Sequence, residues 1–101
     1  MKNNRLLLIL LLAFVGACSL YMRQAPPAGE GLYKKHCRQC HGAEGTKGMF
    51  GAKNLKKSTL TNAAIVLQVQ EGKGWMPSFK KKFSSEELSL LVEYVKTLRQ
   101  N

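Results

Sequence analysis

The stretch Cys37-Arg38-Gln39-Cys40-His41 decides how the rest of the chain is expected to fold. Two cysteines separated by two residues and followed directly by histidine form the attachment pattern for a c-type haem. On a helical turn, positions i and i+3 share one face, so both sulfurs can reach the two vinyl groups on one edge of the porphyrin. His41 then comes below the ring and offers an imidazole nitrogen to iron. The sequence predicts haem attachment through Cys37 and Cys40 and iron ligation by His41.

Other chemistries use cysteines at this spacing, and three of them compete with haem attachment. A thioredoxin-like redox pair needs a βαβ context, and the sequence has no strand alternation strong enough to indicate one. Zinc needs two further ligands, and only His36 and His41 lie near the cysteines. A disulfide between the two thiols is the third alternative. Haem is favoured because the chain also carries an export signal and a second candidate iron ligand, described below.

The N-terminus has the layout of a secretory signal. Lys2 and Arg5 precede a continuous apolar run over residues 6–15, which is too short for a membrane span of ~20 apolar residues. The following Val15-Gly16-Ala17-Cys18 resembles the lipobox of bacterial lipoproteins, which implies cleavage before Cys18 and lipid on its sulfur. Lipidation would account for the odd number of cysteines. An ordinary signal that ends near a cysteine, or an uncleaved anchor, remains open.

The sequence divides into three parts: a lipoprotein-type signal over residues 1–17, a lipid-anchored tether over residues 18–28, and a folded domain over residues 29–101. Pro26-Pro27 stiffens the tether, which lacks helical or strand periodicity. The domain is small enough to need a stabilising element besides its own apolar core. A covalently held haem would supply it.

Three helices are expected in this domain. Gly29, Leu32, Tyr33, Cys37 and Cys40 fall on one helical face, so the segment that bears the cysteines is predicted to be helical. A second helix is predicted over residues 61–71, with a cap at Thr61 or Asn62 and an end at Gly72. A third begins near Ser84 with a capping box to Glu87 and continues to about Leu98. Glycine-containing loops over residues 42–51 and 72–79 separate the helices.

Together these features resemble class I cytochromes c over roughly residues 29–100. In that family a glycine eight residues before the first cysteine and an aromatic residue four before it meet the C-terminal helix. Gly29 and Tyr33 occupy these places, and Leu91 and Tyr94 match the positions opposite them. The resemblance implies an all-α cytochrome c fold, with three main helices and loops wrapped around one covalently bound haem c.

The resemblance also implies the remaining iron ligand. The family's axial methionine lies in a loop just before a proline, which is the setting of Met76 beside Pro77. A core methionine is the alternative role for Met76, and Met49 is a rival ligand that lies close to His41 in sequence. The family also commonly has a proline whose carbonyl binds the other histidine nitrogen, and here Lys53 stands at that position.

The implied function is single-electron transfer, not enzymatic catalysis, between membrane respiratory or photosynthetic partners such as an oxidase, a reductase or a reaction centre. A haem-based enzyme subunit or a gas or redox sensor with a labile sixth ligand is the alternative, and a structural lipoprotein without haem is a third class. The net charge of +10 and the lysines near haem-side segments favour docking to acidic redox proteins over a merely solvated surface. We expect an exported protein, anchored by lipid at the periplasmic or extracytoplasmic face of a bacterial membrane. Nucleic acid is not an expected partner, since no recognition motif is present.

Overall fold

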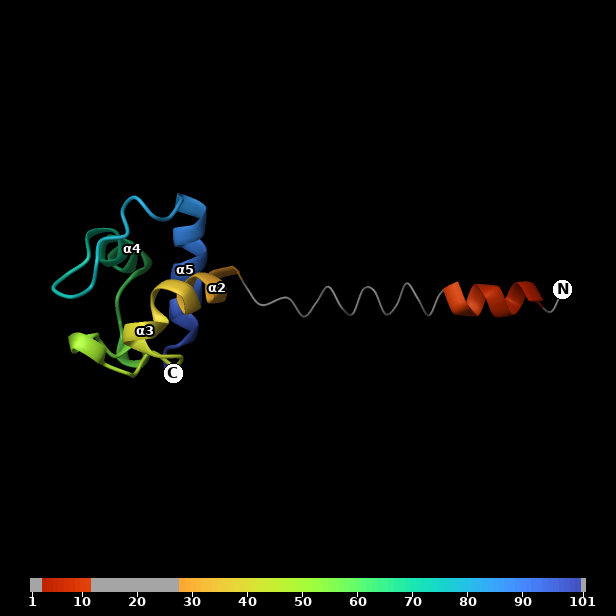
Figure 1. Ribbon diagram of the computed structural model, residues 1–101, viewed down its shortest axis with the longest axis horizontal. Coiled ribbons are helices and arrows are strands. Elements are labelled where there is room, and N and C mark those ends of the chain that lie inside the picture. The colour runs from red at the N-terminus through yellow and green to blue at the C-terminus, as the bar shows by residue number, and fades with distance from the viewer. Residues whose placement is uncertain (1–2, 12–27, 101) are drawn as a thin grey trace.

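The computed structural model of the chain describes residues 3–11 and 28–100. Residues 3–11 form a helix inside the predicted signal segment, drawn in red in Figure 1. None of the helices in the described ranges has the length and apolar character needed to cross a membrane. Cys18, the predicted cleavage site and residues 18–27 of the predicted tether lie outside the described residues.

Residues 28–100 fold into helices joined by loops, which confirms the predicted all-α class (Figure 1). The elements in chain order are α2 (Ala28–His36), α3 (Arg38–His41), the 3-10 turns η2 (Met49–Gly51) and η3 (Leu55–Lys57), α4 (Asn62–Glu71) and α5 (Ser85–Thr97). Between residues 28 and 100 no strand forms. A single isolated bridge between Lys73 and Met76 closes a tight loop after α4.

The predicted helix boundaries are confirmed by the caps that form them. Ser84 accepts a hydrogen bond from the amide of Glu87, and the Glu87 carboxylate accepts one from the amide of Ser84, so α5 begins with a complete capping box. The Thr61 hydroxyl accepts from the amide of Ala64 at 3.2 Å and starts α4. Gly72 ends α4 with a positive φ of 68°.

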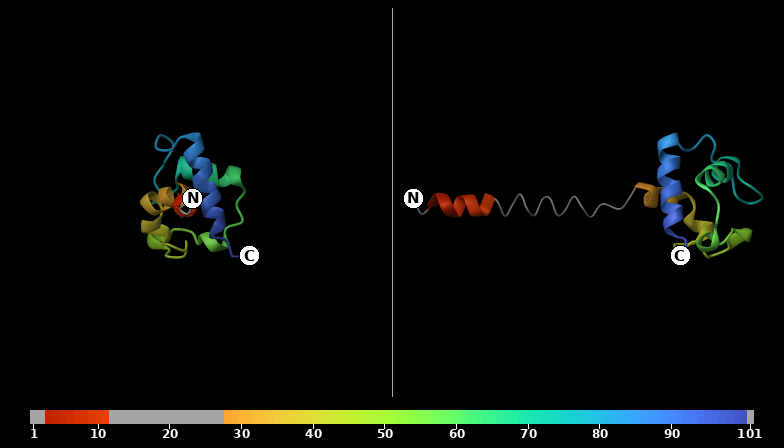
Figure 2. Two further views of the ribbon diagram at one scale, coloured as in Figure 1. Left: turned by 90° about the vertical axis from the view of Figure 1, so that its right-hand side faces the viewer. Right: turned by 180° about the vertical axis from the view of Figure 1, so that it is seen from behind.

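Helices α2 and α5 cross at Gly29, as the resemblance implied. The two helices lie beside each other in both views of Figure 2. A Cβ atom on Gly29 would lie 2.2 Å from the carbonyl oxygen of Leu90 and 3.1 Å from the Cβ of Tyr94. One turn further along α2, the ring of Tyr33 packs against the ring of Tyr94 at a centroid distance of 5.2 Å. The missing side chain at Gly29 therefore sets the distance between the helices.

The segment that bears the cysteines is helical, as predicted, but it is divided into two helices. A turn at Cys37, with φ of −118° and ψ of −34°, separates α2 from α3. The backbone bonds from the Cys37 amide to Tyr33 and from the His41 amide to Cys37 keep helical spacing across the break, at 2.9 and 3.0 Å. Cys37 and Cys40 therefore still lie about one turn apart, although the helix axis is interrupted between them.

Tyr33 ties α2 to the loop after α3. Its hydroxyl donates a hydrogen bond to the carbonyl of Gly42 at 2.6 Å, and the residue is only 1% exposed. Burial, with smaller contributions from Cys37 and Tyr94, raises the pKa of Tyr33 to about 12. The neutral hydroxyl is the form that the fold stabilises.

Replacing Tyr33 by Phe should lower the free energy of unfolding by about 1 kcal/mol at neutral pH, because one buried hydrogen bond is lost. The pH dependence of the free energy of unfolding distinguishes the two proteins more clearly. Because the folded-state pKa of Tyr33 is raised above its unfolded value of ~10, its contribution is complete below pH ~10 and is lost as pH rises toward 12. Denaturant unfolding between pH 9 and 12 should therefore show a steeper alkaline decline in the wild type than in Tyr33→Phe; parallel curves would contradict this assignment.

Candidate haem site

A cavity of about 810 Å³ opens between the helices and loops and lies at the large end of the ~300–1,000 Å³ typical of ligand sites. Its wall is mainly apolar and includes parts of α2, α3, η2, η3, α4, α5 and the loop after α4. Six of the eight buried apolar residues of the described chain form part of this wall: Tyr33, Ile65, Val69, Phe79, Leu91 and Val95. The core of the domain is thus built around the cavity.

Cys37 and Cys40 line this cavity as free, partly buried thiols. Burial, followed by the neighbouring Cys40, raises the pKa of Cys37 to about 11. A catalytic redox pair depends on a cysteine whose pKa is lowered, so this environment does not favour thioredoxin-like chemistry. Two free thiols one helical turn apart on the wall of a large apolar cavity fit the two-point attachment of a haem.

His41 also lines the cavity, at the C-terminal end of α3. Its Nδ1 lies 3.1 Å from the carbonyl oxygen of Lys53, so a carbonyl is present at the position where the family commonly has proline. The carbonyl can only accept a hydrogen bond, which makes Nδ1–H the donor and leaves Nε2 with a free lone pair. Burial lowers the pKa of His41, and the bond to Lys53 opposes this effect in part. The neutral imidazole with an available Nε2 is the form that binds a metal.

The segment that supplies the Lys53 carbonyl is held at several points. The Asn54 side chain accepts a hydrogen bond from the Lys56 amide and caps η3. The C-terminal end of the chain reaches across to the same region, where the Gln100 amide donates to the carbonyl of Lys56 at 3.0 Å and Arg99 donates to the carbonyl of Leu60. The segment that carries the hydrogen-bond partner of His41 is therefore held by its own cap and by the C-terminal end of the chain, and this hydrogen bond orients the imidazole.

Met76 lies on the cavity wall in a tight loop after α4. The amide and carbonyl of Lys73 pair with those of Met76, both at 3.0 Å. Gly72 packs so closely beneath this loop that a Cβ there would lie 2.5 Å from the Met76 carbonyl oxygen. Met49, from η2, also lines the cavity, so the structure brings both candidate methionines to one site.

His36 is partly exposed and also reaches the cavity wall. Its ring packs edge-on against Phe83 at 5.1 Å and Phe79 at 6.1 Å between centroids. Desolvation lowers the pKa of His36, with Lys82 and Lys35 acting in the same direction and Glu87 against them. These contacts describe a packing role for His36.

An aromatic pair at the cavity wall was not predicted from the sequence. Phe50 and Trp75 stack at a centroid distance of 5.3 Å and an interplanar angle of 26°. Phe50 has φ of 53° and ψ of 31°, the only positive φ among the described non-glycine residues. A non-glycine residue in this region costs ~1–3 kcal/mol. Gly48 and Gly51 lie close to Phe50 in the sequence. They indicate a loop but do not indicate that Phe50 has a strained backbone.

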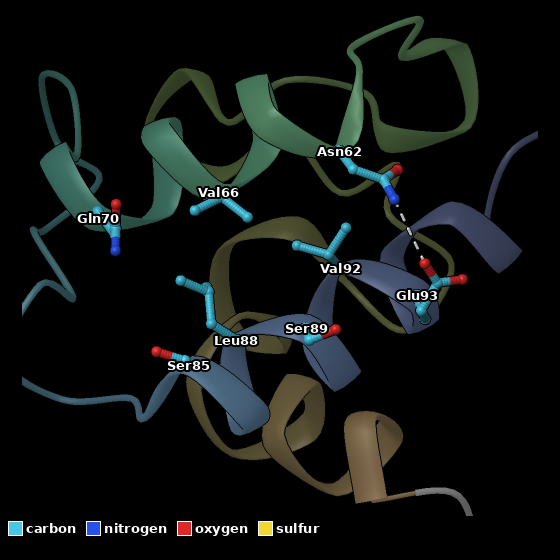
Figure 3. A pocket seen from close by; sticks show the side chains of 8 residues that line it. All are labelled: Asn62, Val66, Gln70, Ser85, Leu88, Ser89, Val92 and Glu93. Atoms are coloured by element: carbon cyan, nitrogen blue, oxygen red, sulfur yellow. Dashed lines mark hydrogen bonds between the residues drawn. The ribbon is translucent and has the colours of Figure 1, made fainter.

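A second hollow, of about 210 Å³, lies between α4 and α5 and shares no lining residue with the large cavity. Figure 3 shows Val66 of α4 facing Leu88 and Val92 of α5. At one end of the hollow the Asn62 side chain donates a hydrogen bond to the Glu93 carboxylate. Ile65 and Val69 of α4 line the large cavity instead. Helix α4 therefore separates the two spaces, with Val66 toward the smaller one and Ile65 and Val69 toward the larger one.

These observations define a class. An all-α domain with a CXXCH turn, an oriented histidine and a large apolar cavity is a small c-type cytochrome. Residues 24–95 match the family model described as cytochrome c oxidase, cbb3-type, subunit III, and the chain belongs to this family of cytochrome c domains.

Relatives agree with the assignment. The chain is 39% identical to "Cytochrome c6" of Leptolyngbya boryana over 67% of this chain and 86% of the relative. It is 36% identical to "Cytochrome c6" of Aphanizomenon flos-aquae over 67% of this chain and 84% of that relative. The solved structure of "KustC0563 c-type cytochrome" superposes with a TM-score of 0.64 at 30% identity, covering 71% of this chain and 98% of the other. The protein is therefore a monohaem electron carrier that binds haem c covalently and exchanges electrons with redox partners.

Proposed function

We propose that Cys37 and Cys40 hold the haem through thioethers and that His41 and Met76 are its axial ligands. The hydrogen bond from His41 Nδ1 to the Lys53 carbonyl is the observation that carries this proposal, because it leaves Nε2 available at the wall of a haem-sized cavity. Met76 is on the wall of the same cavity, in a loop held by paired backbone bonds. When bound, the haem supplies a one-electron couple between ferric and ferrous iron.

The protein's own residues set the conditions for electron transfer. Two permanent ligands leave no vacant iron position for oxygen or peroxide, so the protein acts as a carrier and not as an enzyme. Thioether ligation and an apolar wall favour the ferrous state relative to two histidines. The alternative, a gas or redox sensor or a haem enzyme subunit, would need a sixth ligand that leaves easily, and the fixed loop around Met76 favours the carrier.

Met76→Ala tests this ligand set. We expect loss of the weak sulfur-to-iron band at the red end of the oxidised spectrum, a lower midpoint potential and binding of carbon monoxide by the reduced protein. Met49→Leu is the matched control, because Met49 also lines the cavity and the substitution conserves volume. If Met49→Leu abolishes the band while Met76→Ala retains it, the assignment of the sixth ligand is wrong.

We further propose that the carrier works outside the cytoplasm and is attached to a bacterial membrane by lipid on Cys18. The basic start, the short apolar run and the residues before Cys18 support this proposal. A single acyl chain gives marginal membrane binding, so stable attachment requires more than one chain on the mature N-terminus. Mass spectrometry of the mature protein tests it: a diacylated or triacylated Cys18 is expected, and an unmodified or absent Cys18 would exclude the anchor.

The surface charge supports an acidic redox partner. Lys53, Lys57 and Lys73 are exposed and line the cavity wall, and the ion pairs of the described residues involve other lysines. Positive charge around the opening of the haem cavity increases the rate of association with an acidic protein surface. Among the respiratory or photosynthetic candidates we propose an oxidase, because the matching family model takes its description from a subunit of a cytochrome c oxidase.

Replacing these three lysines by glutamine should slow association with the partner by about tenfold at low ionic strength, and the difference should shrink as salt is added. Stopped-flow electron transfer at several salt concentrations measures this effect. Lys96→Gln is the control, because Lys96 pairs with Glu93 on α5 and does not line the cavity. Equal rates for the triple variant and the wild type would exclude docking through this face.

A further inference from the structure

The stacked pair Phe50 and Trp75 joins two loops that are distant in the sequence. Phe50 belongs to η2, between α3 and η3, whereas Trp75 lies in the loop after α4. Both side chains line the cavity wall, so their contact spans part of its perimeter. Trp75 directly precedes Met76, the proposed iron ligand, in the sequence.

Phe50 and Trp75 are much more exposed to solvent than the residues of the hydrophobic core. Phe50 is 62% exposed and Trp75 is 78% exposed, while the core residues are below 9%. Burial alone therefore does not explain why a bulky residue adopts a positive φ at position 50. A strained residue of this kind persists where the surrounding structure holds it, and such residues cluster at functional sites. In this backbone conformation the Phe50 ring lies on the Trp75 ring.

Backbone hydrogen bonds hold each half of the pair on its own side. The Gly51 amide donates to Gly48 at 3.3 Å and the Ala52 amide donates to Met49 at 3.0 Å, which closes the turn around Phe50. On the other side, the paired bonds between Lys73 and Met76 enclose Trp75. The two hydrogen-bonded turns thus meet at the Phe50–Trp75 stack, and separating them requires breaking that contact.

We propose that Phe50 and Trp75 form an aromatic clasp that holds the Met76 loop against the cavity and slows its opening. Phe50 and Trp75 are positioning residues, because they act on the iron through Met76. Any movement that carries Met76 away from the cavity also carries Trp75 off Phe50. The proposal rests on the proposed ligation by Met76, and its tests separate the two.

The contact itself is tested first, by nuclear magnetic resonance of the reduced holoprotein. Trp75 is the single tryptophan of the chain, so one indole N–H resonance is expected. A nuclear Overhauser effect between the Trp75 indole and the Phe50 ring protons is expected, whichever residue binds iron. Its absence, with both rings assigned, would overturn the clasp without bearing on the ligand set.

The action of the clasp is tested by the binding of imidazole to the oxidised holoprotein. External imidazole reaches the iron only after the Met76 sulfur has left, so its binding rate at saturating concentration reports loop opening. Phe50→Leu and Trp75→Leu should each raise this rate by several-fold to about tenfold, as expected for the loss of one aromatic pair. The double variant should show no larger increase than either single variant, because both remove the same contact.

Matched variants exclude a general loss of stability. Phe50→Tyr and Trp75→Phe keep an aromatic pair and should restore the wild-type rate. Leu67→Ala shortens an exposed apolar side chain of α4 that does not line the cavity, and it should leave the rate unchanged. Unchanged rates in both leucine variants, or effects that multiply in the double variant, would overturn the clasp. If the wild type lacks the sulfur-to-iron band, the ligand proposal fails instead, and the clasp is then decided by the Overhauser contact.

Discussion

Gly29→Ala should lower the free energy of unfolding of the holoprotein by about 2–3 kcal/mol, the upper part of the range for overpacking. The added methyl group would lie 2.2 Å from the carbonyl oxygen of Leu90 and 2.8 Å from its carbon. These are backbone atoms of α5, so the methyl group can be accommodated only if the two helices move apart. Their separation would also disturb the contact between Tyr33 and Tyr94 next to the crossing.

The same substitution two residues away provides the control. Gly31 lies in the same helix, is exposed, and has nothing within 4 Å of an added Cβ. Gly31→Ala should raise the free energy of unfolding by about 0.5–1 kcal/mol, because alanine loses less backbone entropy in a helix. Urea unfolding of both variants, followed by circular dichroism, measures the difference. Similar values for the two alanine variants would mean that the helices do not cross at Gly29.

Features that depend on neighbouring residues in the sequence were predictable. The capping box of α5 requires Ser84 and Glu87 three positions apart, and both bonds form. Thr61 starts α4 for the same local reason. The crossing at Gly29 is a long-range feature, and it was predicted only because the spacing from Cys37 resembled a known family. The CXXCH turn likewise indicated the cofactor, because its spacing follows from the chemistry of the porphyrin.

Features that depend on contacts between distant segments were not predictable from periodicity. The helical face through Cys37 predicted a helical segment but did not indicate the turn at that residue, across which the hydrogen bonds keep helical spacing. The positive φ of Phe50 has no sequence signal, since bulky residues rarely adopt it. Its partner Trp75 comes from a later loop. The bond from Arg99 to Leu60 joins segments that no local pattern relates.

The haem-free chain is expected to be largely unfolded, which is the largest effect that the structure predicts. Six of the eight buried apolar residues line the cavity, so the core is completed only by what fills it. An unfilled space of about 810 Å³ would cost on the order of 20 kcal/mol at ~24 cal/mol per Å³. Water filling and collapse would reduce this cost. Even a fraction of it is comparable with the ~5–15 kcal/mol that stabilises a whole domain.

Two haem-free proteins test this expectation and control for each other. The first is Cys37→Ala/Cys40→Ala, which removes both proposed attachment points, and the second is the wild-type chain produced without the haem-attachment machinery. The second retains every side chain, so loss of structure in both cannot be attributed to the alanines. Far-ultraviolet circular dichroism should show little helix and no cooperative melting in either, against a folded holoprotein. Native-like helicity with a cooperative transition in the wild-type apoprotein would show that α2, α4 and α5 pack stably around an empty cavity, contrary to the dependence of the core on its cofactor.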